Sequence, residues 1–210
     1  MTTPLRISFV PGVTIGKWTN RWEERRPETA LEFVAATEPE QVAVITGGQA
    51  DVGFVRLPIV RDGLSVIRLY GEIAVVVVPA DDPIADNASA TRADLEGRTL
   101  HATDGDLRDV MELIAAGVGA VVLPHAIARS HARKGVVALP VTDAPETEIA
   151  IVWLADATTP DIEEFVGIVR GRGANSSRQT PTPPKERPVR VVEPRKPRPK
   201  RPQQRRRQGR

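Results

Sequence analysis

Residues 5–57 read LRISFVPGVTIGKWTNRWEERRPETALEFVAATEPEQVAVITGGQADVGFVRL, and in this segment short apolar runs alternate with stretches of helical spacing. The apolar runs predict three strands, because each is bounded by turn-forming or polar residues. These strands are expected over 5–10, 31–36 and 51–57. Between the first two, the isoleucine and tryptophans of 15–22 predict a helix capped by Thr14, and 39–46 predict a second helix. The order strand, helix, strand, helix, strand is typical of a parallel sheet covered by helices.

The chain up to residue 171 continues this alternation. Residues 73–78, IAVVVV, form an unbroken apolar run, which is typical of a strand buried on both faces. Other strands are expected over 64–70, 72–79, 99–102, 117–124, 136–139 and 148–154, and helices over 106–116, 125–133 and 160–170. The pattern therefore predicts an α/β fold, built as one domain or as two small lobes.

Charge divides the chain into two regions. Residues 1–177 carry 16 Lys and Arg against 25 Asp and Glu, a net charge of −9, whereas residues 178–210 carry 13 against 2, a net charge of +11. The second region also holds eight prolines, and such a composition does not fold alone. We expect a folded domain over 1–172 and a disordered basic tail over 173–210.

Composition argues against several classes of protein. The chain has no cysteine, so disulfides, thiolate nucleophiles and cysteine-based metal sites are excluded. No apolar stretch approaches the roughly 20 residues of a membrane span, and the start lacks the pattern of a signal peptide, which favours a cytoplasmic protein without membrane contact. No metal-ligand spacing, catalytic triad or nucleophile elbow is present, so we expect no enzyme activity, no metal and no cofactor.

Three segments, in the order in which they occur, resemble one known family. They are the segment 4–58, the segment IRLYGEIAVVVVPADDPIA at 67–85 and the segment LIAAGVGAVVLPHAIA at 113–128. The chain from about residue 5 to 171 resembles the effector-binding, or substrate-binding, domain of LysR-type transcriptional regulators. The resemblance implies a periplasmic-binding-protein-like (type 2) fold with mixed sheets, in which two α/β lobes are joined by crossing strands and a small effector binds in the cleft.

The sequence departs from that family in two places. Full regulators carry a winged helix-turn-helix before the first strand, whereas here Met1 lies four residues before Leu5, so we expect this chain to lack that module. Between Leu100 and Met111 the family has several tens of residues more, including a strand and a helix. The second lobe is therefore expected to be abbreviated, which removes part of one cleft wall.

The loop Pro11, Gly12, Val13 and Thr14 is the first candidate ligand site. It lies at the start of a predicted helix, where free backbone N–H groups, a hydroxyl and the helix dipole favour a carboxylate or phosphate. The position agrees with the ligand site that the family resemblance implies. The alternative is that Thr14 only caps the helix.

Three more residues are candidates for the same ligand. Arg56 follows a strand near the carboxyl end of the sheet and could hold a carboxylate through two parallel hydrogen bonds, or it could be an ordinary surface arginine. Thr103 and Asp104 lie about where the second lobe would face the cleft. The histidines and glycines near them are expected to be structural: His125 begins a helix, while Gly117 and Gly119 allow close packing.

The basic tail is the candidate nucleic-acid contact. Its cationic runs consist of Arg195, Lys196, Arg198, Lys200, Arg201, Arg205, Arg206 and Arg207. Prolines and charge repulsion keep such a chain extended, so it could follow a phosphate backbone and release counterions. Without aromatic residues it has no base-stacking platform, so binding would be non-specific. The alternatives are a solubilising tail or one that folds back on the acidic body.

Two functions follow from these features. The first is a transcription-related LysR-like protein that binds a small, anionic effector and contacts nucleic acid through its tail, as a homodimer. The second is a degenerate relative that binds no ligand and acts as a dimerisation module, for instance with intact LysR-type regulators. A solute-binding or enzymatic use of the same fold is disfavoured.

Overall fold

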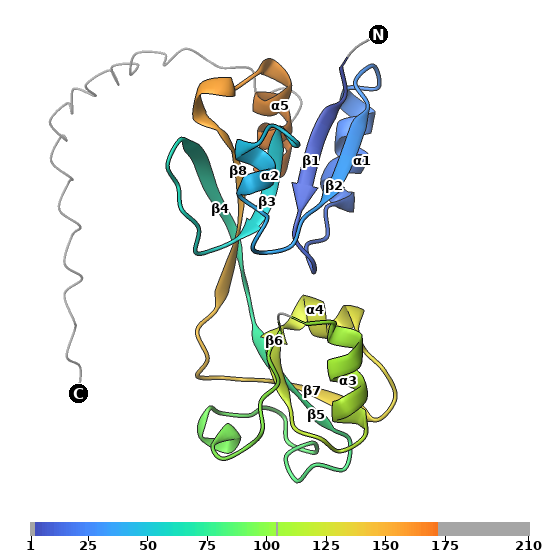
Figure 1. The fold of residues 1–210 in the computed structure, drawn as a ribbon. Helices are drawn as coiled ribbons and strands as arrows, with labels where there is room; N and C mark the ends of the chain where they lie inside the picture. Colours follow the sequence, from blue (N-terminus) through green and yellow to red (C-terminus); the bar gives the residue numbers. More distant parts are fainter. Residues whose placement is uncertain (1–2, 104, 172–210) are drawn as a thin grey trace, which may run out of the picture. The chain divides into compact units, whose positions relative to one another are not determined.

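A computed structural model describes residues 3–103 and 105–171 of the 210-residue chain (Figure 1). The chain divides into two units, 1–175 and 176–210, and every described residue belongs to the first. The predicted tail and Asp104 lie outside the described residues. No described helix has both the length and the apolarity to cross a bilayer.

The larger sheet has five strands in the order β2-β1-β3-β8-β4. These strands are β1 (Leu5–Phe9), β2 (Leu31–Ala35), β3 (Val52–Arg56), β4 (Leu64–Glu72) and β8 (Thr147–Leu154). The first three are parallel to one another, whereas β8 pairs antiparallel with both β3 and β4. The alternating strands and helices of 5–57 therefore form the predicted parallel unit, and the sheet as a whole is mixed.

Helices cover both faces of the larger sheet. The helices α1 (Gly16–Arg25) and α5 (Pro160–Val169) pack on one face, and the single turn α2 (Ala43–Thr46) packs on the other. On the first face, Trp18 of α1 stacks on Phe54 with 4.9 Å between ring centroids, and Trp22 meets Phe165 edge to face at 5.8 Å. Both tryptophans are buried, so the helix face that carries them forms part of the core.

The smaller sheet has three antiparallel strands in the order β6-β5-β7. They are β5 (Ala74–Pro79), β6 (Val121–Pro124) and β7 (Val136–Pro140). The helices α3 (Leu107–Ala115) and α4 (His125–Ser130) cover one face, and residues of 84–95, including the short helix η1 (Ala93–Leu95), cover the other. The central strand β5 is thus buried on both faces, as its unbroken apolar run predicted.

Two connections join the sheets and define two lobes. Strand β4 of the larger sheet ends at Glu72 and continues through Ile73 into β5, while β7 of the smaller sheet leads through 141–146 back into β8. The chain therefore crosses twice between the lobes, and the short turn η2 (Ala155–Ala157) then leads to α5. The two-lobed α/β fold with mixed sheets is confirmed.

Several local predictions need correction. Ile15 rather than Thr14 is the N-cap of α1, and no side chain caps that helix. The helix expected over 39–46 is a single turn preceded by turns, because Glu38 and Gln41 bond to Arg56 instead of extending a helix. The strand expected over 99–102 is reduced to one bridge between Leu100 and Ala120.

Candidate functional site

The loop from Val10 to Thr14 connects β1 to α1 through a tight turn. The N–H of Val13 donates to the carbonyl of Val10 at 3.3 Å, and Gly12 has a φ of +89°, which favours glycine. The side chain of Val13 is buried in the core of the larger lobe, whereas Thr14 is exposed. Packing of Val13 therefore fixes the loop and leaves the hydroxyl of Thr14 in solvent.

The backbone of this loop offers hydrogen-bond donors at the start of α1. Within the described residues, the N–H groups of Thr14, Ile15 and Gly16 have no protein acceptor, and the hydroxyl of Thr14 makes no hydrogen bond. Such donors at the positive end of a helix suit an anion. The absence of a side-chain cap leaves this end of α1 open to a ligand.

Gly12 brings the loop against the smaller lobe. A Cβ atom at this position would lie 3.0 Å from Ile127 Cγ1 and 3.4 Å from Ala126 Cβ, both in α4. The same Cβ would lie 3.5 Å from Nη2 of Arg56. Gly12 thus lies where residues of both lobes meet, and a side chain there would crowd α4.

Arg56 is buried and paired with a buried carboxylate. Its Nε donates to Oε2 of Glu72 at 2.6 Å and its Nη2 to Oε1 at 3.2 Å, and the two side chains are only 4% and 5% exposed. The two parallel hydrogen bonds form a bidentate ion pair between the ends of β3 and β4. The predicted carboxylate clamp therefore exists, but its partner is a residue of the chain itself.

Three further groups complete the surroundings of Arg56. Its Nη1 donates to Oε1 of Glu38, whose side chain is 51% exposed, and its Nη2 donates to the carbonyl of Pro11 at 3.0 Å. The side-chain amide of Gln41 makes two hydrogen bonds to the backbone of Arg56. It donates to the Arg56 carbonyl at 3.0 Å and accepts from the Arg56 N–H at 2.7 Å. Arg56 thereby fixes the start of the Pro11–Thr14 loop.

The charges around Arg56 also shift the pKa values of Arg56 itself and of the nearby Tyr70. Burial lowers the pKa of Arg56, but the hydrogen bond and charge of Glu72 and the charge of Glu38 more than offset it, so the pKa is raised. Burial, followed by the negative charge of Glu72, raises the pKa of the Tyr70 phenol. Arg56 is therefore a fixed positive charge that faces two carboxylates.

The remaining candidates are not joined to this cluster. Thr103 is exposed in a bend beyond the bridge at Leu100, and among the described residues it makes no hydrogen bond to the loop or to Arg56. Asp104 and all eight cationic tail residues, Arg195 to Arg207, lie outside the described residues. The ligand and nucleic-acid roles of these residues stay predictions.

Sequence reasoning missed Glu72, Glu38 and Gln41. The sequence Glu72-Ile73-Ala74 gives no distinctive signal of a buried ion pair, because Glu148-Ile149-Ala150 has the same pattern and Glu148 is 40% exposed. Nothing in the local sequence identifies Gln41 as a hydrogen-bond partner of the Arg56 backbone, because the two residues are 15 positions apart. Glu38 directly precedes the helix predicted over 39–46, a position where acids are common, so the sequence gives no sign of its contact with Arg56.

Two other expected details, those of His125 and Gly119, are confirmed, whereas Gly117, with a φ of +85°, has nothing within 4 Å of its Cβ and so serves the turn and not close packing. His125 is the first residue of α4. Gly119 has a φ of +71°, and a Cβ there would lie 2.7 Å from the carbonyl oxygen of Thr99, so this glycine permits close packing. Among the described residues, no group of three or more His, Cys, Asp or Glu could hold a metal ion.

Two α/β lobes joined by two crossing segments, with a donor-rich loop where the lobes meet, define a receptor domain of the periplasmic-binding-protein-like class. The sequence model described as the LysR substrate binding domain matches residues 2–109 and 105–174. The chain belongs to the LysR substrate-binding domain family. It is therefore related to transcription regulators that respond to small molecules.

Two curated relatives are full regulators. The chain is 25% identical over 202 residues to the Hca operon transcriptional activator HcaR of Escherichia coli, and 26% identical over 203 residues to the HTH-type transcriptional regulator IlvR of Caulobacter vibrioides. Each alignment covers 81% of this chain and 68% of the relative. The chain thus corresponds to about two-thirds of each regulator.

Solved structures share the fold. OxyR of Corynebacterium glutamicum superposes with a TM-score of 0.68 at 22% identity, covering 80% of this chain and 64% of OxyR. A variant of full-length BenM superposes with a TM-score of 0.68 at 18% identity, covering 80% of this chain and 66% of BenM. The BenM effector binding domain with its effector benzoate superposes with a TM-score of 0.66 at 18% identity, covering 80% of this chain and 90% of that domain. This chain therefore spans slightly less than two-thirds of that OxyR chain and of full-length BenM.

The comparisons also show the abbreviated second lobe. The HcaR alignment runs over 202 residues, but 81% of this chain is about 170 residues, so about 30 aligned positions have no counterpart here. The two family matches meet at 105–109, residues that both matches include. The shortening therefore lies at the start of α3, within the interval that the sequence indicated.

Proposed function

We propose that this domain binds a small organic anion where its two lobes meet, and that it serves transcription regulation. The anion would accept hydrogen bonds from the Thr14 hydroxyl and from the backbone N–H groups at the start of α1. The observation that carries this proposal is the set of donors at Thr14, Ile15 and Gly16 that have no acceptor in the described part of the chain, on a loop held by Arg56. The BenM domain, which shares the fold, has benzoate as its effector.

In this proposal Arg56 acts mainly as a positioning residue. Its hydrogen bonds to Glu72 and Pro11 leave little of the guanidinium for a ligand, unless a ligand carboxylate displaces the exposed Glu38. The other predicted contacts, Thr103 and Asp104, would approach the ligand from the smaller lobe. Membership of the LysR family supports this arrangement.

A thermal-shift screen of small carboxylates tests the ligand proposal. We expect at least one compound to raise the melting temperature, and Thr14→Ala to weaken its binding about tenfold, the loss of about one hydrogen bond to a charged group. Thr3→Ala is the matched control, because Thr3 is also exposed. Equal binding by Thr14→Ala and wild type would contradict the proposed site.

We also propose that the domain over 1–172 is followed by a tail over 173–210 that contacts nucleic acid without sequence preference. The net charge of +11 in residues 178–210 supports this proposal. Deleting 178–210 should abolish binding to a DNA duplex, whereas a neutral tail of the same length should not restore it. Duplex binding that survives the deletion would exclude the tail as the contact.

The pairing of Arg56 supports an alternative function. An arginine neutralised by Glu72 and Glu38, together with a shortened second lobe, is also what a domain without a ligand would have. In that case the chain would serve as a dimerisation module, either with itself or with intact LysR-type regulators. A screen without any hit, together with a dimer in analytical ultracentrifugation, would favour this function over ligand binding.

A further inference from the structure

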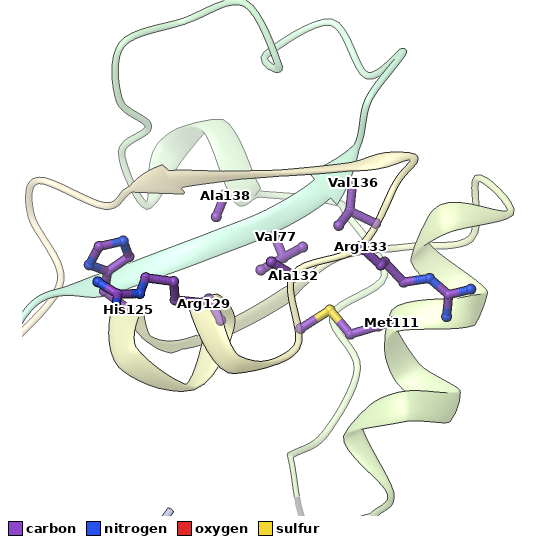
Figure 2. A pocket seen from close by; sticks show the side chains of 9 residues that line it. Val77, Met111, His125, Arg129, Ala132, Arg133, Val136 and Ala138 are labelled. Carbon is purple, nitrogen blue, oxygen red and sulfur yellow. The ribbon is translucent and has the colours of Figure 1, made fainter. Parts of the chain in front are cut away.

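A cavity lies on the smaller lobe, away from the Pro11–Thr14 loop. It is open to solvent on one side and is bordered by α3, by α4 with the residues that follow it, and by strands β5 and β7 (Figure 2). Its volume is about 150 Å³, and an adjoining depression of about 350 Å³ shares Met111, Ala132 and Arg133 with it. A volume of about 150 Å³ is enough for one benzene ring.

The inner wall of the cavity is apolar. Val77 and Met111 are buried at its base, and Val136 lines the side formed by β7. The other apolar lining residues are all alanines, namely Ala128, Ala132 and Ala138. Their short side chains leave open the space that leucines would fill. The inner part therefore suits the apolar body of a ligand.

The rim of the cavity is cationic. His125 and Arg129 are four residues apart on α4, so their side chains lie on the same face of the helix, and Figure 2 shows them next to each other at one end of the cavity. Arg133 lies near Met111 at the other end and pairs with Glu112 at 3.2 Å. Within the described residues, Arg129 has no hydrogen bond or ion pair through its side chain.

Among the described residues, Arg21, Arg61 and Arg170 likewise have no side-chain partner, so what distinguishes Arg129 is its place beside this cavity. Of the residues that the structure describes, no acid lines the 150 Å³ cavity itself, and Glu112 lines only the adjoining depression. The cavity thus combines an apolar interior with a positive mouth. That combination selects molecules with an apolar body and one negative group.

We infer that this cavity is a second ligand site, which takes a small amphipathic carboxylate of about one ring. The ring would lie among Val77, Met111 and Ala132, and the carboxylate would accept hydrogen bonds from Arg129, with His125 beside it. None of the residues that line the cavity belongs to the Pro11–Thr14 loop or the Arg56 cluster. The site therefore does not depend on the function proposed above.

Benzoate is a suitable probe, and benzamide is its neutral counterpart of nearly equal shape. In a titration of the full chain followed by ¹H–¹⁵N NMR, benzoate should shift the amide signals of 125–138, and benzamide should do so at least tenfold more weakly. Arg129→Gln should weaken benzoate binding about tenfold at these signals. Arg21→Gln, which alters an exposed arginine on α1, should leave the affinity unchanged.

Filling the cavity gives an independent test. Ala138→Leu should abolish the benzoate shifts at 125–138, and because Ala138 is exposed on β7 the variant should keep its fold. Ala132→Leu, at another exposed position, should give the same result. Thr14→Ala should not alter these signals. The inference is overturned if benzoate leaves 125–138 unshifted, if Arg129→Gln binds like wild type, or if both leucine variants still bind.

Discussion

Arg56 and Glu72 lie side by side in the interior, and their pairing makes both residues tolerable there. Burial of a lone carboxylate is costly, so removing the arginine leaves Glu72 without compensation. We expect Arg56→Ala to lower the free energy of unfolding by roughly 3–5 kcal/mol, measured by urea denaturation. Glu38→Gln should cost less than about 1 kcal/mol, because Glu38 is 51% exposed. If Arg56→Ala and Glu38→Gln lowered the free energy of unfolding equally, the ion pair of Arg56 and Glu72 would not be buried in solution.

Gly12 is constrained by both its backbone and its neighbours. Its φ of +89° strains any other residue, and a Cβ would lie 3.0 Å from Ile127. Gly12→Ala should therefore destabilise the domain by about 1–2 kcal/mol in thermal unfolding. Gly16→Ala, with nothing within 4 Å of its Cβ, is the control and should be neutral or stabilising. A neutral Gly12→Ala would mean that the loop does not pack on α4.

At the scale of elements, the periodic segments were predicted well and the short ones were not. The long apolar runs of β5 and β8 and the capped helix α5, where Thr159 accepts from the N–H of Ile162, follow their local sequence. The turn α2 and the bridge at Leu100 do not. In these short segments tertiary hydrogen bonds, such as those of Glu38 and Gln41 to Arg56, outweigh local propensity.

The segment that follows β5 contains an ion pair which makes stability depend on pH. The hydrogen bond from Arg98, at 2.5 Å, and the N–H of Ile84 lower the pKa of Asp82. A lowered native pKa stabilises the fold above the unfolded value of about 3.9, and this stabilisation is lost as the pH falls through the native pKa. Asp82→Asn should therefore reduce the acid dependence of the urea midpoint below about pH 4. Asp81→Asn, at an exposed neighbour, should leave that dependence unchanged.

At the scale of the whole molecule, the divided charge predicts how nucleic-acid binding responds to salt. If all eight cationic residues of 195–207 contact phosphates, the logarithm of the binding constant should fall with the logarithm of salt concentration with a slope of about −7. Fluorescence anisotropy with two duplexes of unrelated sequence measures this slope and should give equal affinities. A slope near zero, or a strong preference for one duplex, would contradict non-specific contact through the tail.

The amino-acid sequence alone determined the α/β class, the two-lobed family and the interval in which the second lobe is shortened. The α/β class follows from hydrophobic periodicity, which is a local feature of a chain, whereas the two lobes and the shortened interval are what the resemblance to the LysR family implies. Only the tertiary structure decided that Arg56 is paired with Glu72 and Pro11, which lie 16 and 45 residues away, and that Ala128, Ala132 and Ala138 leave a cavity. Ion pairs and cavities arise where distant segments pack together, and their free energy depends on side-chain contacts that no local pattern records.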